Sequence, residues 1–161
     1  MSELDPYTFG AEQRCFGCGP HNDRGMRLRF RREGDEVVTD LTAPEGWEGP
    51  PNVLHGGLQA TVADELAGWT RVGLLGRMGV TTSLRVRYVR PLRIGAPIEA
   101  RGRIASRKDP IVTVNVRLLQ EGKLGCSATV SYMLPDEEKA ADYLGGALPE
   151  GWRPLFRPDG S

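Results

Sequence analysis

The chain has 161 residues, a length that suits one domain with a sizeable core. Lysine plus arginine and aspartate plus glutamate number 21 each, so no basic excess indicates a nucleic-acid partner and no acidic excess indicates a solvating tail. Any functional use of charge must therefore be local.

The N-terminal residues MSELDPYTFGAEQR lack the basic and apolar regions of a signal peptide. No segment approaches the roughly 18 apolar residues that a membrane-spanning helix needs. Cys15, Cys18 and Cys126 are an odd set, whereas small secreted domains usually carry an even number of cysteines. These features predict a cytoplasmic protein with no membrane partner.

Apolar residues alternate with arginines from Met26 to Arg31, which predicts a half-buried strand followed by a turn at 33–35. A weaker strand is predicted at 36–42. The proline and glycine residues of 44–51 then form a loop that leads to His55.

From Gly57 to Leu75 apolar residues recur every three or four positions, which predicts the one long helix of the chain. Its other face carries small residues around one carboxylate, in the order Gly57, Ala60, Asp64, Gly68 and Arg71. Packing of another backbone against glycine and alanine is the structural alternative for this face.

Alternation returns in four segments, 84–88, 98–104, 112–118 and 124–134, which predict an antiparallel meander. Strands, one helix and more strands indicate an α+β domain in which a curved antiparallel sheet wraps around the helix. Residues 135–161 are predicted to form a tail without chemistry, with a short helix near 136–144.

The first turn of a helix offers unpaired N–H groups, so Gly56 and Gly57 are candidates to bind a carbonyl that develops negative charge. A glycine pair that only turns the chain into the helix explains the same residues. Along the helix Asp64 lies about 10 Å from Gly57 and about 13 Å from His55. One chain cannot bring these groups to one carbon, which predicts a homodimer with antiparallel helices and shared sites.

Three segments resemble hotdog-fold thioesterases of the phenylacetate-degradation type and their 4-hydroxybenzoyl-CoA thioesterase relatives: CFGCGPHNDRGMRLRF, HGGLQATVADELAGW and TTSLRVRYVRPLRIGAPI. The resemblance implies a hotdog fold and hydrolysis of an acyl-CoA to free acid and CoA, without a cofactor. It also favours a homodimer or a dimer of dimers, a homotetramer. The predicted organisation is an N-terminal segment with a CxxC turn (1–25), the hotdog domain (26–134) and a tail (135–161).

By this resemblance Asp64 is the catalytic acid, either a nucleophile or a general base for water. Gly57, with Gly56 beside it, supplies the backbone N–H for the thioester carbonyl, and His55 lies next to it. Glu65 is a less favoured acid, because adjacent helix residues point about 100° apart and only one faces a given site.

Thr81 stands where relatives place a hydroxyl that positions water, and Thr82 and Ser83 are close substitutes. Several relatives have an asparagine six residues before the histidine, but this chain has Gly49 there. The nearest amide, Asn52, is the candidate to replace it.

Eight basic residues against Glu99 lie between Arg85 and Lys108. Most are interpreted as the solvent faces of strands. Arg90, beside a loop, is the candidate to bind CoA phosphates.

Cys15 and Cys18, with His21 and Cys126, include thiol and imidazole ligands, but a second close cysteine pair is absent, so we predict no metal site. Trp47 is the candidate acyl-pocket residue, whereas Trp69 is assigned to the core. A hotdog enoyl-CoA hydratase or dehydratase and a non-catalytic acyl-CoA-binding protein remain alternative functions.

Overall fold

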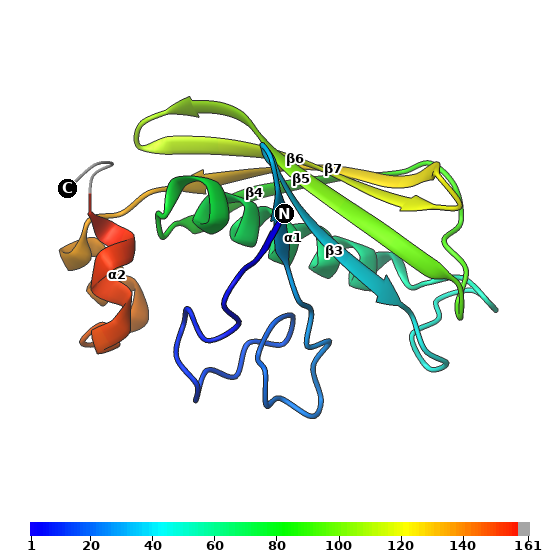
Figure 1. Cartoon of the computed structure of the whole chain (residues 1–161), viewed down its shortest axis with the longest axis horizontal. Helices are drawn as coiled ribbons and strands as arrows, with labels where there is room; N and C mark the ends of the chain where they lie inside the picture. The colour runs from blue at the N-terminus through cyan, green and yellow to red at the C-terminus, as the bar shows by residue number, and fades with distance from the viewer. Residues whose placement is uncertain (158–161) are drawn as a thin grey trace.

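The computed structural model describes residues 1–157, and the predicted α+β fold is confirmed (Figure 1). The long helix is α1 (Gly56–Leu75), and the C-terminal segment contains α2 (Glu137–Leu144) and a 3-10 helix, η1 (Glu150–Phe156). The strands are β1 (Ser2–Glu3), β2 (Arg31–Glu33), β3 (Glu36–Thr42), β4 (Val80–Tyr88), β5 (Pro97–Lys108), β6 (Ile111–Gln120) and β7 (Lys123–Met133). They form one antiparallel sheet in the order β1-β2-β3-β5-β6-β7-β4.

The core lies between α1 and one face of the sheet. Alternate residues of β6, from Val112 to Leu118, are fully buried, as the period of two predicts. Val62 and Leu66 of α1 are also fully buried. Gly102 of β5 permits close contact here, since a Cβ at this position would meet Thr70 Oγ1 at 2.3 Å and Leu66 Cγ at 3.3 Å.

The ends of α1 follow from its flanking residues. His55 is the N-cap, and its Nδ1 accepts a hydrogen bond of 2.9 Å from the Gly57 N–H. Gly76 ends the helix in the left-handed conformation, φ 62°, and donates its N–H to Val72 O. The helix thus begins one residue before the predicted Gly57.

The predicted four-strand meander is wrong for its first strand. β5, β6 and β7 follow one another in the sheet, but β4 pairs with β7 at the far edge, from Val80 opposite Met133 to Tyr88 opposite Cys126. The link after β4 is not a hairpin turn: its Leu92 is buried in the core, and Leu92 O accepts a hydrogen bond from Leu54 N.

The predicted strand at Met26–Arg31 is also largely wrong. Strand β2 begins only at Arg31, because residues before it bond to the cysteine-containing loop: Met26 N donates to Phe16 O and Leu28 N donates to Gly17 O. The alternation does identify the buried side, since Leu28 is 5% exposed. The sequence pattern did not identify the backbone partner.

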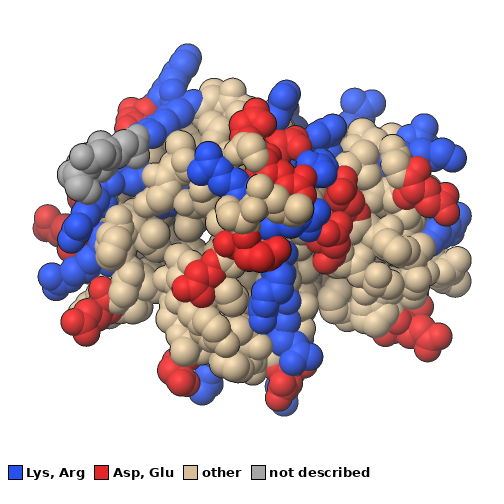
Figure 2. All heavy atoms as spheres, viewed as in Figure 1, with Lys and Arg blue, Asp and Glu red and all other residues tan. Residues whose placement is uncertain are grey.

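Opposite charges cross the outer part of the sheet. Arg101 on β5 forms ion pairs with Glu33, Glu36 and Glu99, and Arg117 on β6 also pairs with Glu36. Figure 2 shows acidic and basic side chains interspersed over the visible face. The basic residues of β5 and β6 therefore do not act as one positive surface.

The three described helices include none that is long and apolar enough to cross a membrane.

Gly102→Ala is predicted to lower the free energy of unfolding by about 1–3 kcal/mol, because the added methyl group overlaps Thr70 and pushes α1 from the sheet. Urea unfolding measures this change. Gly146→Ala is the matched control, since a Cβ there meets nothing within 4 Å. Equal stability of the Gly102 variant and the control would contradict the close packing.

Candidate functional site

Asp64 lies on α1 at the wall of a cavity and contacts β4. The Thr81 hydroxyl donates a hydrogen bond of 3.1 Å to Asp64 Oδ1. Burial raises the pKa of the Asp64 carboxyl, although the Thr81 hydrogen bond and the positive charge of Arg71 oppose the rise. The structure thus brings together two of the predicted site residues, Asp64 and Thr81, within one chain.

The cavity has a volume of about 410 Å³, and α1 supplies one wall through Asp64, Glu65, Gly68 and other residues. Its aromatic lining comes from distant parts of the chain: Phe9, Trp69, Tyr132 and Trp152. An apolar, concave wall with a few polar groups is typical of a small-molecule site.

Residues near the two ends of the chain build the aromatic wall together. Phe9 contacts Trp69 edge to face at a centroid distance of 5.3 Å and Trp152 at 5.6 Å. The Trp152 Nε1–H also donates a hydrogen bond to Phe9 O. The C-terminal segment, interpreted from sequence as a tail without chemistry, therefore contributes to the cavity wall.

Of the two tryptophans considered for the acyl pocket, Trp69 lines the cavity and Trp47 does not. Trp69 is 3% exposed and stacks on Phe30, which confirms it as a core residue, but it also lines the cavity. Trp47 packs partly buried against the core, and it is absent from the lining of this cavity. The loop that carries Trp47 folds back on the helix start, where His55 N donates to Trp47 O, and this contact directs it away from Asp64.

Arg71 is buried one turn beyond Gly68 and stabilises the floor of the cavity. Its Cζ lies 4.6 Å from the centroid of the Tyr132 ring, and its Nη1 donates to Arg77 O. The Tyr132 hydroxyl in turn donates to the Asp64 backbone carbonyl at 3.0 Å. The carboxylate, the cation and the phenol are therefore held in one packed cluster.

At the helix start the predicted carbonyl-binding amide is already paired, because the Gly57 N–H donates to His55 Nδ1. The Tyr88 hydroxyl donates to Gly56 O at 2.8 Å. A separate hollow of about 340 Å³ lies here, lined by Gly56, Gln59, Arg90 and six other residues. None of these residues lines the cavity at Asp64, so one chain keeps the two groups of predicted site residues apart.

The substitutes for Thr81 lie elsewhere. The Thr82 hydroxyl donates to Ser131 O, and the ladder between β4 and β7 is irregular between Thr81 and Ser83. Ser83 is exposed opposite Ser131. Of the three hydroxyls, the Thr81 group is the one that contacts Asp64.

The remaining candidates are exposed. Asn52 has a positive φ of 61° in the loop before α1, a backbone conformation that asparagine tolerates, so local geometry alone explains this residue. The Arg90 Nη1 donates to Leu124 O at the edge of the 340 Å³ hollow. Neither contacts Asp64 within the chain.

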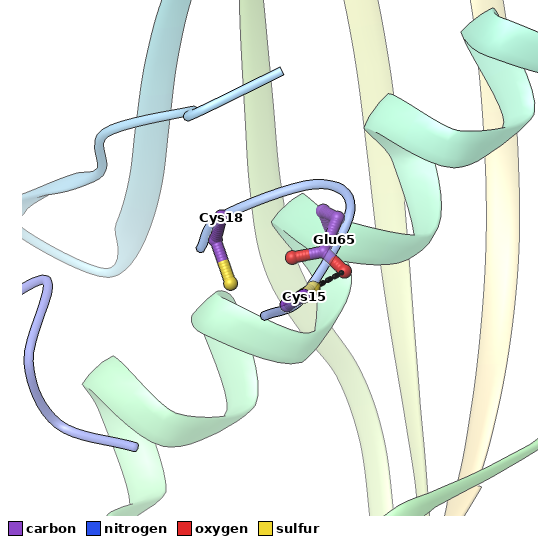
Figure 3. A group of neighbouring side chains, drawn as sticks. All are labelled: Cys15, Cys18 and Glu65. Atoms are coloured by element: carbon purple, nitrogen blue, oxygen red, sulfur yellow. Dashed lines mark hydrogen bonds between the residues drawn. The ribbon is translucent and has the colours of Figure 1, made fainter. Parts of the chain in front are cut away.

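Glu65 lies apart from the Asp64 and Thr81 pair and contacts the N-terminal loop instead. Its Oε1 lies 3.0 Å from Cys15 Sγ in a hydrogen bond, and Cys18 lies beside them (Figure 3). Burial, together with the hydrogen bond to Cys15, raises the pKa of the Glu65 carboxyl to about 8. This contact was not predicted from the sequence, since 50 residues separate Cys15 from Glu65 and the cysteine pair was the only signal.

The fold resembles that of proteins of known structure, and part of the chain matches a family model. Residues 51–127 match the family model described as the thioesterase superfamily. This range contains the start of α1, Asp64 and Thr81. A search of curated proteins finds no significant match.

Many solved structures share the fold. A thioesterase superfamily protein is 23% identical over 83% of this chain and 70% of its own, with a TM-score of 0.72. A phenylacetic acid degradation-related protein from Ralstonia eutropha is 23% identical, covering 66% of this chain and 84% of its own, with a TM-score of 0.61. A hypothetical thioesterase from Streptococcus pneumoniae, solved with coenzyme A, is 18% identical, covering 66% and 87%, with a TM-score of 0.62.

Residues 51–127 thus match the thioesterase superfamily model, and the solved structures confirm the hotdog fold that the sequence motifs indicated.

Asp64→Asn is predicted to raise the melting temperature at neutral pH, because the folded protein holds the ionised carboxyl at a raised pKa. A raised carboxyl pKa means that the folded state binds the proton more tightly than the unfolded state. The stabilising difference should therefore be absent at low pH, grow as the pH rises through the unfolded pKa, and level off above the folded pKa. Thermal unfolding across this pH range measures it, and a difference that shrank with rising pH would contradict the burial of Asp64.

Proposed function

We propose that the protein is an acyl-CoA thioesterase that hydrolyses an acyl-CoA to a free acid and CoA. The observation that carries the proposal is the half-buried Asp64 carboxyl, which accepts the Thr81 hydroxyl hydrogen bond at the wall of a 410 Å³ cavity. A carboxylate beside a hydroxyl, with no charged partner in direct contact among residues 1–157, suits the activation or positioning of water.

Thioester hydrolysis requires a water oxygen to add to the carbonyl carbon and the carbon–sulfur bond to break. As a general base, Asp64 takes the proton of that water while Thr81 holds the water or the carboxylate in place. As a nucleophile, Asp64 first forms an acyl anhydride with loss of the CoA thiolate, and water then cleaves the anhydride. Both routes need an ionised Asp64, so its raised pKa moves the acidic limb of the pH profile upward.

The aromatic wall indicates which part of the substrate this cavity accepts. Phe9, Trp69 and Trp152 offer apolar faces near Asp64. The lining contains two arginines that could pair with phosphate groups, Arg14 and Arg71, and Arg71 is buried against Tyr132. We infer that the cavity holds the acyl group. The lining from residues 1–25 and 135–161 makes these segments part of the acyl pocket built on the domain of 26–134.

The CoA portion is proposed to bind at the other end of α1. Arg90 borders the 340 Å³ hollow at the helix start, and an arginine there can pair with phosphate oxygens. The Streptococcus pneumoniae protein of the same fold was solved with coenzyme A, which supports this ligand class. An acyl-CoA substrate and three free cysteines also agree with the predicted cytoplasmic location.

A homodimer is proposed to bring together the two halves of the site, the start of α1 and the cavity at Asp64. Strand β4 lies at the edge of the sheet, with an unpaired side and exposed apolar residues at Leu84, Tyr88 and Val89. An exposed edge of this kind is suited to pairing with a second strand. In a two-fold dimer with antiparallel helices, Gly57 of one chain would face Asp64 of the other, as the spacing along α1 requires.

Asp64→Ala and Asp64→Asn are predicted to lower kcat by about 100-fold or more while leaving the fold and assembly intact, because they remove the base or nucleophile. A hydrolysis screen over short, long, branched and aromatic acyl-CoAs, with detection of the released thiol, measures the loss and identifies the acyl class. The matched control is Asp35→Asn, at an exposed aspartate in the turn between β2 and β3.

Unchanged turnover in the Asp64 variants would refute this assignment. Hydration of an enoyl-CoA without thioester cleavage would instead favour a hydratase. Tight retention of CoA with negligible turnover on every acyl chain would favour a binding protein.

Mixed dimers are predicted to regain activity when one chain carries Asp64→Ala and the other carries Gly57→Val, because one of the two shared sites then keeps both intact groups. A Cβ at Gly57 would meet His55 Nδ1 at 3.1 Å, so the larger side chain disturbs the amide that is proposed to bind the carbonyl. The heterodimer should approach half of the wild-type activity per dimer, because one of its two sites is intact. The activity is measured after the heterodimer is copurified through tags on both chains.

The matched comparison mixes Asp64→Ala chains with Asp64→Asn chains, which leaves no intact site in any dimer. An inactive Asp64→Ala and Gly57→Val heterodimer, once shown to form, would contradict a shared site.

A further inference from the structure

A second cluster of reactive side chains lies beside the proposed catalytic acid and has no part in the hydrolysis described above. Cys15 and Cys18 come from the N-terminal loop, and Glu65 comes from α1. One ligand atom from each lies within 4.8 Å of the other two, and Figure 3 shows the three side chains gathered where the loop crosses the helix. All three line the 410 Å³ cavity.

We propose that Cys15, Cys18 and Glu65 bind one Zn²⁺ ion, with the fourth coordination position open to the cavity next to Asp64. Two thiolates and a carboxylate are ligands that Zn²⁺ takes, and three protein ligands with one open position are a known arrangement for this ion. His21 and Cys126, which were considered with the cysteine pair from sequence, do not belong to the cluster among residues 1–157.

The distances fit a tetrahedral ion after a small adjustment. Zinc bonds of about 2.3 Å to sulfur and 2.0–2.2 Å to oxygen place neighbouring sulfur and oxygen ligands about 3.6 Å apart. Cys15 Sγ and Glu65 Oε1 lie 3.0 Å apart, so these two atoms need to move apart by about half an ångström to admit the ion. The remaining separations are at most 4.8 Å, so closing them to the roughly 3.8 Å between two zinc-bound sulfur atoms needs about 1 Å of side-chain movement at most.

The loop is shaped to hold its sulfur atoms against Glu65. Gly17, between the two cysteines, has no room for a side chain, since a Cβ there would meet Glu65 Cγ at 2.0 Å and Cδ at 2.3 Å. The turn also returns the Gly19 N–H to Cys15 O at 2.9 Å. The backbone therefore approaches the carboxyl as closely as a glycine allows.

The cluster is shielded from solvent: Cys18 is 4% exposed, and the Cys15 thiol donates a hydrogen bond of 3.0 Å to Glu65 Oε1. A bound cation would compensate both the buried Cys18 sulfur and the Glu65 carboxyl, which has no positive side chain in hydrogen-bond contact among the described residues.

An independent group also points to the cluster. The Trp69 indole Nε1 is buried and has no hydrogen-bond acceptor within bonding distance in residues 1–157. Trp69 and Cys18 line the same cavity. A zinc-bound thiolate is an acceptor that this N–H group otherwise lacks.

A redox role suits the geometry less well. The Cys15–Cys18 turn lies in an irregular loop, not at the start of a helix where a CxxC pair is activated in redox proteins. A disulfide would also leave the buried Glu65 without a partner.

The test measures metal directly and needs no substrate, so its result is independent of the proposed thioesterase activity. The full chain is expressed with zinc in the medium, purified without chelator, and its metal content is determined by mass spectrometry. The metal-free protein is then titrated with Co²⁺, which gives thiolate charge-transfer and tetrahedral visible bands when cysteine sulfur coordinates it.

The expected result is one zinc per chain and a saturable Co²⁺ spectrum at one equivalent. Cys15→Ser and Cys18→Ser should abolish the charge-transfer bands, and Glu65→Gln should weaken Co²⁺ binding by about tenfold or more. Cys126→Ser is the matched control, because this third cysteine is buried on β7 outside the cluster and its loss should leave the spectrum unchanged.

Two results would overturn the proposal. One is a folded wild-type chain that neither carries stoichiometric metal nor gives thiolate bands with Co²⁺, which keeps the test valid even where a variant fails to fold. The other is a Cys15–Cys18 disulfide in protein alkylated at cell lysis, without bound metal, which would make the cysteines a redox pair.

Discussion

The candidate site depends on the close packing of α1 against the sheet at Gly102. Because Leu66 and Thr70 contact this glycine, the helix has one rotation about its own axis relative to the sheet. Asp64 and Glu65 then have to lie on the parts of the helix that the sheet does not cover. The strands of the sheet supply Thr81 and Tyr132 on one side of these acids, and the N-terminal loop covers the other side.

Adjacent carboxylates on this helix consequently have different chemistry. The Asp64 carboxyl accepts a hydrogen bond from the Thr81 hydroxyl and lies near the positive charge of Arg71. The Glu65 carboxyl instead contacts the Cys15 sulfur, in a loop that has no room for a methyl group at Gly17. Burial raises the pKa of both, but Glu65 loses more of its contact with water and rises further, to about 8. A rotation of about 100° between neighbouring helix positions is enough to produce this difference.

Local periodicity was sufficient for the helix and most strands, since these depend on which face is buried. It could not place β4, because a strand shows the same alternation whichever neighbour it pairs with. The segment after β4 is also a long link with a buried Leu92, and not a hairpin turn. The choice among Thr81, Thr82 and Ser83 depended on a ladder irregularity that leaves no mark in composition. The place of Trp152 in the cavity wall and the contact of Glu65 with Cys15 were missed, because the partners Phe9 and Cys15 lie more than forty residues away in the chain.

The hydrogen bond between the Gly57 amide and His55 Nδ1 has a consequence for any ligand that approaches the start of α1. A carbonyl oxygen arriving there meets a donor that already has an acceptor, so binding exchanges one hydrogen bond for another. The net gain for a neutral ground-state carbonyl is then small, whereas an oxygen that carries developing charge competes better with the imidazole nitrogen. Competition with His55 Nδ1 therefore selects ligands by the charge on their oxygen more than by their shape.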